Sequence, residues 1–402
     1  MTVLATTEVQ DSKPQERLRI ESIDVLRGLL MIVMALDHAR QFFTNVRIDP
    51  TDPLLSWPAL FMTRWVTHLC APGFIALCGA SVYLQRQRGR SAEYMTRKLI
   101  ARGLWLIFVE LTFVNFAIYL NLHTHMLQVI WAIGVSMLVL ALLQRLPVAW
   151  VAFYGFLVVA LHNLLDVFHA SQFGPAAWLW MLLHEQGRIA LHDKSLLIIE
   201  YPLLPWTGVI ALGYAFGSVV VKQPRVRQRW CLAAGAICLA MFAVLRVTNL
   251  YGDPVPFHLL ENTTRSAMSF LDLTKYPPSL DFLLAMCGIL LFVYVMFDKL
   301  VEQQRMKRLT QIARVYGSVP FFFYVLHLYL LHLLLIPIAL VIANRLHVPL
   351  PQADDSQIPA WWGFSLPVVY TVWIAVVAAL YPACRWFSRL KNERRDWWLS
   401  YL

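Results

Sequence analysis

The residues best suited to chemistry in this chain lie in one apolar stretch near its start. Asp24 and Arg27 begin a predicted helix there, and Asp37 and His38 follow further along it. At 1.5 Å per residue, Arg27 and His38 share one face of that helix, about 16 Å apart along the axis. Ionisable side chains at such depth in a membrane helix are costly and are functional candidates by default. We expect His38 to act as a general base, oriented by Asp37 or by a neighbouring group.

A second ionisable group follows in the next apolar stretch. Arg64, His68 and Pro72 are spaced four residues apart, so they share one helix face. Pro72 should kink that helix near His68, because proline cannot donate the backbone hydrogen bond. His68 is a second candidate for the base, and it could instead position an acceptor together with Arg64 or stabilise an oxyanion. A hydrogen-bonded packing histidine is the alternative interpretation.

A run of basic residues precedes the third apolar stretch. Its density exceeds what membrane orientation requires, and such a run can hold the phosphates of a nucleotide-containing ligand. Membrane topology alone is the alternative interpretation. With Asp24, the candidates for binding the phosphates are Arg27, Arg86, Arg97, Lys98 and Arg102. The candidates for binding an acceptor at the opposite face are Arg64, His125, Arg246, Asn249 and Lys275.

One further group of residues has the spacing of metal ligands. His162, Asp166 and His169 share a helix face, but a structural metal site usually needs a fourth ligand. The sequence offers none that is clear, so we expect a polar face and no metal.

The composition shows what kind of scaffold positions these residues. The chain is 59% hydrophobic and 14% charged, against about 25% charged in soluble proteins. Several apolar runs reach the ~20 residues that cross a bilayer. The sequence therefore predicts an all-α, polytopic transmembrane helical bundle of about ten spans. The expected spans are 25–43, 58–84, 99–120, 127–144, 148–167, 198–220, 231–248, 279–297, 316–343 and 362–383.

The charge distribution predicts orientation and partners. An even number of spans with both termini inside places most of the 34 Lys and Arg in inside segments, as membrane topology favours. The net charge of +10 therefore indicates the lipid bilayer as partner and not nucleic acid. Residues 1–20 are expected to be a disordered cytoplasmic tail, 21–384 the transmembrane domain, and 385–402 a basic and aromatic cytoplasmic tail. A homodimer is possible.

Two family resemblances rest on these motifs. Asp24-x-x-Arg27-Gly28 followed by His38 resembles the first-helix pattern of acyltransferase-3 membrane proteins, in which a histidine at this spacing is taken as catalytic. A closer resemblance, over nearly the whole chain, is to bacterial membrane proteins similar to the catalytic domain of heparan-α-glucosaminide N-acetyltransferase. The stretches that carry it are 22–28, 65–72, 205–209, 249–254, 273–279 and 319–327.

The second resemblance implies acetyl transfer from cytoplasmic acetyl-CoA to an acceptor reached from the other side of the membrane. In the lysosomal enzyme an asparagine aligns with Asp37, and the catalytic histidine lies beyond it in the outer loop. Here 39–57 contains no histidine, so the base is His38 or His68, or the chemistry has been lost or altered in this chain. The resemblance names no acceptor for the bacterial group.

With the candidate residues above, the resemblances thus imply a multi-pass acyltransferase of the bacterial inner membrane, with acetyl-CoA as co-substrate. It would acetylate a hydroxyl or amine of an envelope glycan or another polar acceptor, either directly or through an acyl-histidine. The alternative is a transporter or flippase for an envelope precursor. Such a protein would account for the spans, but less well for a basic segment beside the aspartate–arginine–histidine pattern.

Overall fold

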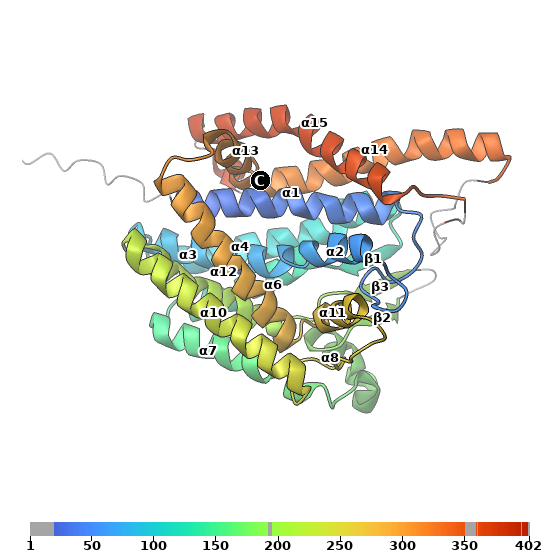
Figure 1. Ribbon diagram of the computed structural model, residues 1–402. Coiled ribbons are helices and arrows are strands. Elements are labelled where there is room, and N and C mark those ends of the chain that lie inside the picture. The colour runs from blue at the N-terminus through green and yellow to red at the C-terminus, as the bar shows by residue number, and fades with distance from the viewer. Residues whose placement is uncertain (1–19, 192–194, 350–358, 360, 395, 401–402) are drawn as a thin grey trace, which may run out of the picture.

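The computed structural model describes residues 20–191, 195–349, 359, 361–394 and 396–400. Nearly all of the predicted tail 1–20 lies outside these residues. The chain forms a bundle of long helices with α1 (Glu21–Phe43) running through its upper part in Figure 1. The all-α prediction is confirmed, although a small sheet lies at one end of the bundle.

The remaining elements follow in chain order. The helices are α2 (Pro58–Thr67), α3 (Cys70–Gln87), α4 (Ala92–Val109), α5 (Asn115–Tyr119), α6 (Val129–Leu143), α7 (Val148–Leu161), α8 (Ala177–Leu183), α9 (Leu204–Val220), α10 (Pro224–Thr248), α11 (Thr263–Leu271), α12 (Leu280–Glu302), α13 (Lys307–Ser318), α14 (Pro320–Leu346) and α15 (Leu366–Glu393). Short helical turns are η1 (Glu110–Val114), η2 (His162–Leu165), η3 (Ala170–Ala176) and η4 (Trp397–Ser400). The strands are β1 (Thr124–Leu127), β2 (Gly187–Ala190) and β3 (Leu196–Ile199), in the order β1-β3-β2.

Each of the ten expected spans contains a helix. Within the described ranges, seven helical segments are long and apolar enough to cross a membrane, and α6 and α9 are shorter apolar helices. The tenth is α1, which carries the charged residues singled out above. The chain is therefore an integral membrane protein, while the number of crossings and the orientation stay predictions.

Two of the expected spans depart from a single regular helix. The expected span 58–84 is broken between α2 and α3 at His68 and Leu69, as Pro72 predicts, because proline leaves the carbonyl four residues earlier without a helical partner. The expected span 198–220 begins later than predicted. Residues 196–199 pair as β3, and the helix starts at Leu204 with Pro205 in its first turn, where the missing N–H costs nothing.

Glycines allow two pairs of helices to touch along their backbones. A Cβ atom at Gly28 of α1 would overlap the Ala313 carbonyl oxygen of α13, and one at Gly317 would overlap the Asp24 carbonyl oxygen. A glycine of α9 allows a second close approach. A Cβ at Gly213 of α9 would overlap backbone atoms of α3, which is the close packing that small residues permit in membranes.

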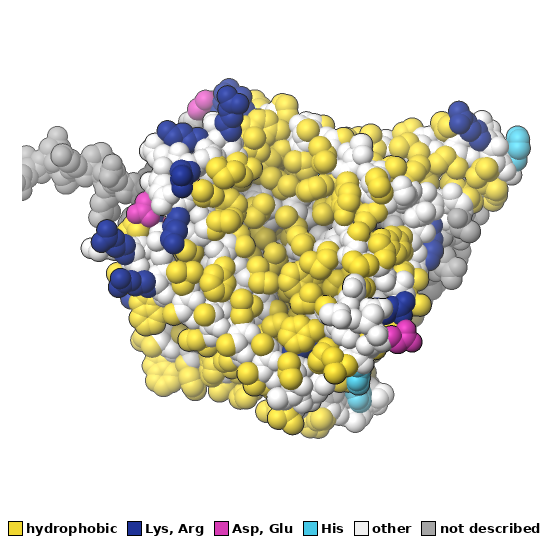
Figure 2. Space-filling model, in the orientation of Figure 1, with side chains coloured by type: hydrophobic (Ala, Val, Ile, Leu, Met, Phe, Trp, Pro, Cys, Tyr) yellow, Lys and Arg dark blue, Asp and Glu magenta, His cyan; other side chains and the backbone are white. Residues whose placement is uncertain are grey.

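The surface separates an apolar belt from two polar ends. On the face seen in Figure 2, hydrophobic side chains form a broad belt, with Lys and Arg gathered at the end where α1 begins. We call this end, with Arg27, Lys98, Arg102 and Lys391, the basic end. The opposite end, with the sheet and residues 44–57 and 249–279, is the loop end. At the basic end α15 continues to Glu393, so the expected boundary between 384 and 385 falls inside a helix.

Candidate functional site

Two adjoining cavities lie inside the bundle between its ends. The cavity nearer the basic end has a volume of about 260 Å³, and the cavity nearer the loop end has about 210 Å³. Four side chains line both cavities: Met34, Phe74, Val129 and Tyr324. The two cavities therefore meet at this ring of four residues, which we call the junction.

Arg27 is held in place at the mouth of the basic-end cavity. Its guanidinium donates to the Asp24 carboxylate, to the Gly317 carbonyl oxygen and to the Ser81 hydroxyl, each at 3.0 Å. The helix α1 thus presents Arg27 between α3 and α13, where a further opening of about 400 Å³ also reaches it. A guanidinium fixed in this way keeps its position when an anion approaches, which favours phosphate binding.

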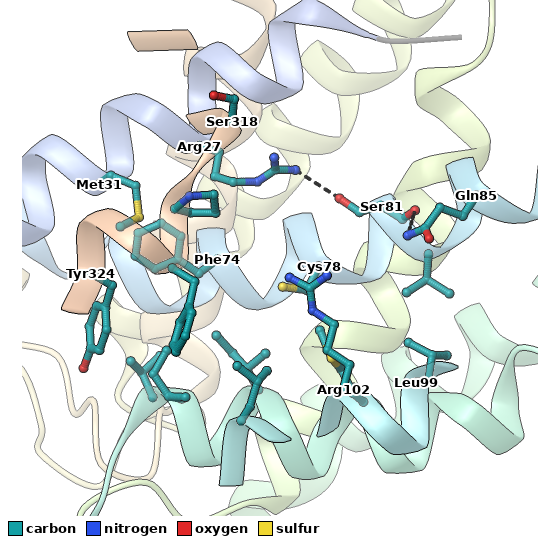
Figure 3. Close-up of a pocket in the computed structure, with 18 of the residues that line it drawn as sticks. Arg27, Met31, Phe74, Cys78, Ser81, Gln85, Leu99, Arg102, Ser318 and Tyr324 are labelled. Atoms are coloured by element: carbon teal, nitrogen blue, oxygen red, sulfur yellow. Dashed lines mark hydrogen bonds between the residues drawn. The ribbon is translucent and has the colours of Figure 1, made fainter. Parts of the chain in front are cut away.

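Two more predicted cations line the same cavity. Lys98 and Arg102 extend from α4, and the Lys98 ammonium donates to Gln85 Oε1 at 2.8 Å. In Figure 3, Tyr324 lies toward one end of the cavity, while Ser81, Gln85 and Arg102 lie toward the other. The cavity therefore has a cationic mouth and an apolar interior lined by Met31, Leu106 and Ile133 among others.

The other two predicted cations lie away from this cavity. Arg86 donates to the Arg90 carbonyl oxygen at 2.7 Å, and Arg97 pairs with Glu93 one turn earlier. The side chain of Arg97 is 80% exposed, so a phosphate bound there would remain in water. Neither residue lines the cavity, which leaves Arg27, Lys98 and Arg102 as its cations from the predicted set.

His38 lines the loop-end cavity and is held by a second histidine. Its Nδ1 atom lies 2.6 Å from His327 Nε2, and the two rings are stacked with centroids 4.9 Å apart. On the other side of its ring, His327 places Nδ1 3.0 Å from the Phe323 carbonyl oxygen. Both His327 and Phe323 belong to α14, so this helix orients the α1 histidine.

This arrangement specifies the proton positions when both rings are neutral. A carbonyl oxygen only accepts, so His327 carries its proton on Nδ1 and has a lone pair on Nε2. His38 must then donate from Nδ1 to that lone pair, which leaves its own Nε2 unprotonated. Hydrogen positions follow here from the network, as they do in most protein structures. His38 therefore has a basic nitrogen that is not used by His327.

Asp37 does not contact His38 in this network. Its carboxylate accepts from Arg40 of the same helix at 3.0 Å and from the Arg64 guanidinium of α2. Arg64 also donates to the Tyr276 hydroxyl at 3.5 Å. Adjacent residues project about 100° apart on a helix, which separates the two side chains. The neighbouring group that orients His38 is therefore His327, while Asp37 fixes Arg64 in the cavity wall.

His68, the second candidate base, has a packing position. It lies at the break between α2 and α3, is 3% exposed, and packs against the Phe282 ring at a centroid distance of 5.4 Å. Thr67 and Cys70 line the loop-end cavity, but His68 does not. The break turns its ring toward α12, so the geometry favours His38 over His68 as the base.

The far wall of the loop-end cavity comes from two loops. Lys275 and Tyr276 precede α12, and Glu200 and Tyr201 follow β3. The Lys275 ammonium lies 5.0 Å from the Tyr276 ring centroid and 6.0 Å from that of Tyr201. This wall combines cationic, anionic and aromatic groups, which suits a polar acceptor. Lys275 is thus a predicted acceptor-binding residue that the fold brings to the cavity.

Arg246 and Asn249 instead order the loop that carries Lys275. Arg246 is 1% exposed and donates to the carbonyl oxygens of Ser269 and Phe270 in α11 and of Val255 and Asp272 on either side of that helix. Asn249 ends α10 in the left-handed conformation and bonds the backbone of Phe257 through both side-chain atoms. These side chains stabilise the wall and do not line the cavity.

Two carboxyl groups of this loop are partly withdrawn from water, and one of them holds the loop in place. Asp253 accepts from the Thr274 backbone and hydroxyl and from the Ser279 hydroxyl, on either side of Lys275. Burial raises the pKa of Asp272 to about 7, with nearby carboxylates adding to the effect and Arg246 opposing it. Asp253 therefore fixes the loop directly beside the cavity wall.

The remaining predicted ligands lie apart from the cavities. His125 is in β1, whose neighbours Met126 and Gln128 line the loop-end cavity while His125 does not. Asp166 bonds His184 Nε2 at 2.8 Å, and His169 is exposed. Across the described parts of the chain, no group of three or more His, Cys, Asp or Glu could hold a metal ion.

Several residues that the fold brings to the site are hard to recognise in the sequence. In the sequence, His327 is a weak candidate that follows an aromatic stretch. Tyr324, Glu200, Tyr201 and Tyr276 have no predicted role. One signal is present, because Tyr324 and His327 are three residues apart and therefore share a face of their helix. That face can be connected to His38 only through tertiary structure.

Comparison with known protein families identifies the family to which the first part of the chain is similar. Residues 19–250 match the family described as heparan-alpha-glucosaminide N-acetyltransferase, catalytic. No curated protein matches the chain. The matched region includes α1, with Arg27 and His38, and the α4 residues Lys98 and Arg102, whereas His327 and Lys275 lie beyond it.

Proposed function

Because the chain belongs to the heparan-alpha-glucosaminide N-acetyltransferase catalytic family, we propose that it transfers an acetyl group from acetyl-CoA to a hydroxyl or amine. The family match supports an acetyltransferase-like membrane protein. The donor, the acceptor and the direction across the membrane are parts of the proposal. The single observation that carries it is the His38 Nδ1–His327 Nε2 contact, which leaves His38 Nε2 unused by His327, at a cavity that adjoins a second, cation-lined cavity.

The donor would enter from the basic end. Arg27, Lys98 and Arg102 suit the phosphates of CoA, and the apolar interior suits the pantetheine arm. The thioester would then reach the junction, which adjoins the cavity that His38 lines. Basic residues favour the cytoplasmic side of a membrane, so we propose that the basic end faces the cytoplasm, with both termini inside, in a bacterial inner membrane.

His38 would act as the base in acyl transfer. Its Nε2 takes the proton from the acceptor hydroxyl or amine as that atom attacks the thioester carbonyl carbon. The tetrahedral intermediate expels the CoA thiolate, and the His38 imidazolium returns the proton to the sulfur. His327 keeps its proton on Nδ1 throughout and accepts from His38 Nδ1. The step consumes one thioester and yields one acetylated acceptor and one CoA thiol.

The acceptor would enter from the loop end. Lys275, Tyr276, Tyr201 and Glu200 offer charged and aromatic contacts of the kind that bind polar, glycan-like molecules. The chemistry of this wall supports a polar acceptor, as the family name does, and leaves its identity to experiment.

The test uses purified protein in lipid nanodiscs with acetyl-CoA and, as a probe amine, glucosamine. We expect release of CoA thiol and an acetylated product by mass spectrometry. His38→Ala should lower the rate by about 10²-fold or more, while His332→Ala, a histidine of α14 that lines neither cavity, should not. Full activity in His38→Ala would contradict the proposed role.

The rival function, transport of an envelope precursor, predicts a different outcome in the same preparation. A transporter would move its substrate across a vesicle membrane without cleaving the thioester. Wild-type protein that releases no CoA under any of these conditions would favour that alternative.

A further inference from the structure

Tyr324 occupies a position that the mechanism so far does not use. It lies in the first turns of α14 and is one of the four junction residues that line both cavities. The other three, Met34, Phe74 and Val129, offer no side-chain hydrogen-bond donor to a ligand. A thioester that moves from the basic-end cavity to His38 must therefore pass a single hydroxyl group.

The hydroxyl of Tyr324 is buried and unused. The residue is 3% exposed, and its oxygen has no hydrogen-bond partner among the residues that the structure describes. A buried hydroxyl without a partner is costly, so native proteins nearly always satisfy it. The cost is explained if the partner is a ligand that enters the junction.

The ring of Tyr324 is fixed beside the proposed base. Its centroid lies 6.0 Å from that of His38, with the rings at 72°, and 5.6 Å from that of His327. Tyr324 and His327 are one helical turn apart on α14, so the same helix positions both. One helix therefore sets the position of the Tyr324 ring relative to both histidine rings, beside the junction that Tyr324 lines.

We propose that Tyr324 is a catalytic residue whose hydroxyl donates a hydrogen bond to the carbonyl oxygen of the thioester. This inference rests on the proposed acyl transfer. As the acceptor attacks the carbonyl carbon, the C=O π electrons move to the oxygen, and the Tyr324 O–H stabilises the resulting oxyanion without giving up its proton. When the intermediate collapses, those electrons re-form the carbonyl and the C–S bond breaks.

His68 and Arg64 are the sequence-based candidates for this role, but the structure packs His68 against Phe282 and commits Arg64 elsewhere. Its guanidinium is bound to Asp37 and to the Tyr276 hydroxyl, and it lines only the loop-end cavity. Tyr324 lines both cavities and is uncommitted among the described residues. We therefore assign the hydrogen bond to the oxyanion to Tyr324 of α14. Arg64 keeps its proposed role in binding the acceptor substrate.

The test is Tyr324→Phe, which removes one oxygen atom and keeps the ring. In nanodiscs with acetyl-CoA and glucosamine, we expect kcat to fall about 10²- to 10³-fold, the usual effect of losing one oxyanion donor. The KM for acetyl-CoA should change less than about twofold, because the hydrogen bond from the Tyr324 hydroxyl acts mainly in the transition state. Tyr329→Phe is the matched control, since that hydroxyl bonds the Phe113 carbonyl oxygen outside both cavities.

A second variant separates catalysis from packing. A fluorinated tyrosine placed at position 324 keeps the shape but has a more acidic phenol, so it should retain activity where phenylalanine does not. Unchanged kcat in Tyr324→Phe, with wild-type active and His38→Ala inactive, would overturn the assignment of Tyr324 alone. Wild-type protein that releases no CoA would overturn the proposed function and this inference together.

Discussion

Replacing His327 by leucine removes the group that fixes the tautomer of His38. In the structure His38 Nδ1 lies 2.6 Å from His327 Nε2, and the opposite tautomer pair would set His327 Nδ1 against the Phe323 carbonyl oxygen, lone pair to lone pair. Losing a buried hydrogen bond costs about 1 to 3 kcal/mol. At about 1.4 kcal/mol per tenfold, kcat should fall about 5- to 150-fold, with KM for acetyl-CoA nearly unchanged.

Two further variants test whether His327 acts through His38. In His327→Gln the amide oxygen replaces the accepting nitrogen, so activity should recover in part. In the double variant His38→Ala/His327→Leu, the rate should equal that of His38→Ala alone, because residues that act as a unit are not additive. The assay is CoA thiol release in nanodiscs, with thermal unfolding as a check on folding. A further 5- to 150-fold loss in the double variant would refute the reasoning, since His327 would then act independently.

Three other predictions follow from the bundle and its loops. Arg27→Ala should raise the KM for acetyl-CoA about tenfold or more, whereas the exposed Arg97→Ala should leave it unchanged, and equal effects would contradict the cavity assignment. Gly28→Ala should destabilise the protein by about 1 to 3 kcal/mol, seen as a lower midpoint of thermal unfolding, because its Cβ would overlap the Ala313 carbonyl oxygen. The pKa of Asp272 near 7 exceeds its unfolded value of about 3.9, so the folded protein binds the extra proton and its stability should fall as the pH rises from about 4 to 7. Asp272→Asn should weaken this pH dependence of the stability. An identical pH dependence of stability in the variant and the wild type would contradict this role of Asp272.

The helices of this protein could be predicted because lipid imposes a strong pattern on sequence. A run of about 20 apolar residues is typical of a membrane-spanning helix and of little else, and all ten expected spans contain helices. The start of the sixth span was misplaced because Leu196–Ile199 is as apolar as a helix but pairs with β1 and β2. Strand pairing depends on distant partners, which hydropathy does not report.

The candidate site, too, could be predicted only in part from the sequence. His38 and Arg27 could be identified because ionisable residues are rare in membrane helices. The partner of His38 could not, since 289 residues separate it from His327 along the chain. Asp37 was an attractive partner by proximity in sequence, but helix geometry directs it to Arg40 and Arg64.

Residues whose types suit a functional site can also occupy structural positions outside the cavities. Arg246 has the charge expected of an acceptor-binding residue, yet its guanidinium is saturated by four backbone carbonyl oxygens. His68 has the chemistry of a base, yet it packs at a helix break against Phe282. Residue type and spacing admitted both roles, and only burial and partners distinguish them.

The most direct test of the account is a structure of the protein in lipid nanodiscs with CoA bound. We predict density for the CoA phosphates beside Arg27, Lys98 and Arg102, and for the terminal sulfur at the junction, facing His38 Nε2 and the Tyr324 hydroxyl. CoA bound elsewhere, or a sulfur separated from His38 by a closed junction in every state observed, would contradict the claim that this histidine catalyses acyl transfer.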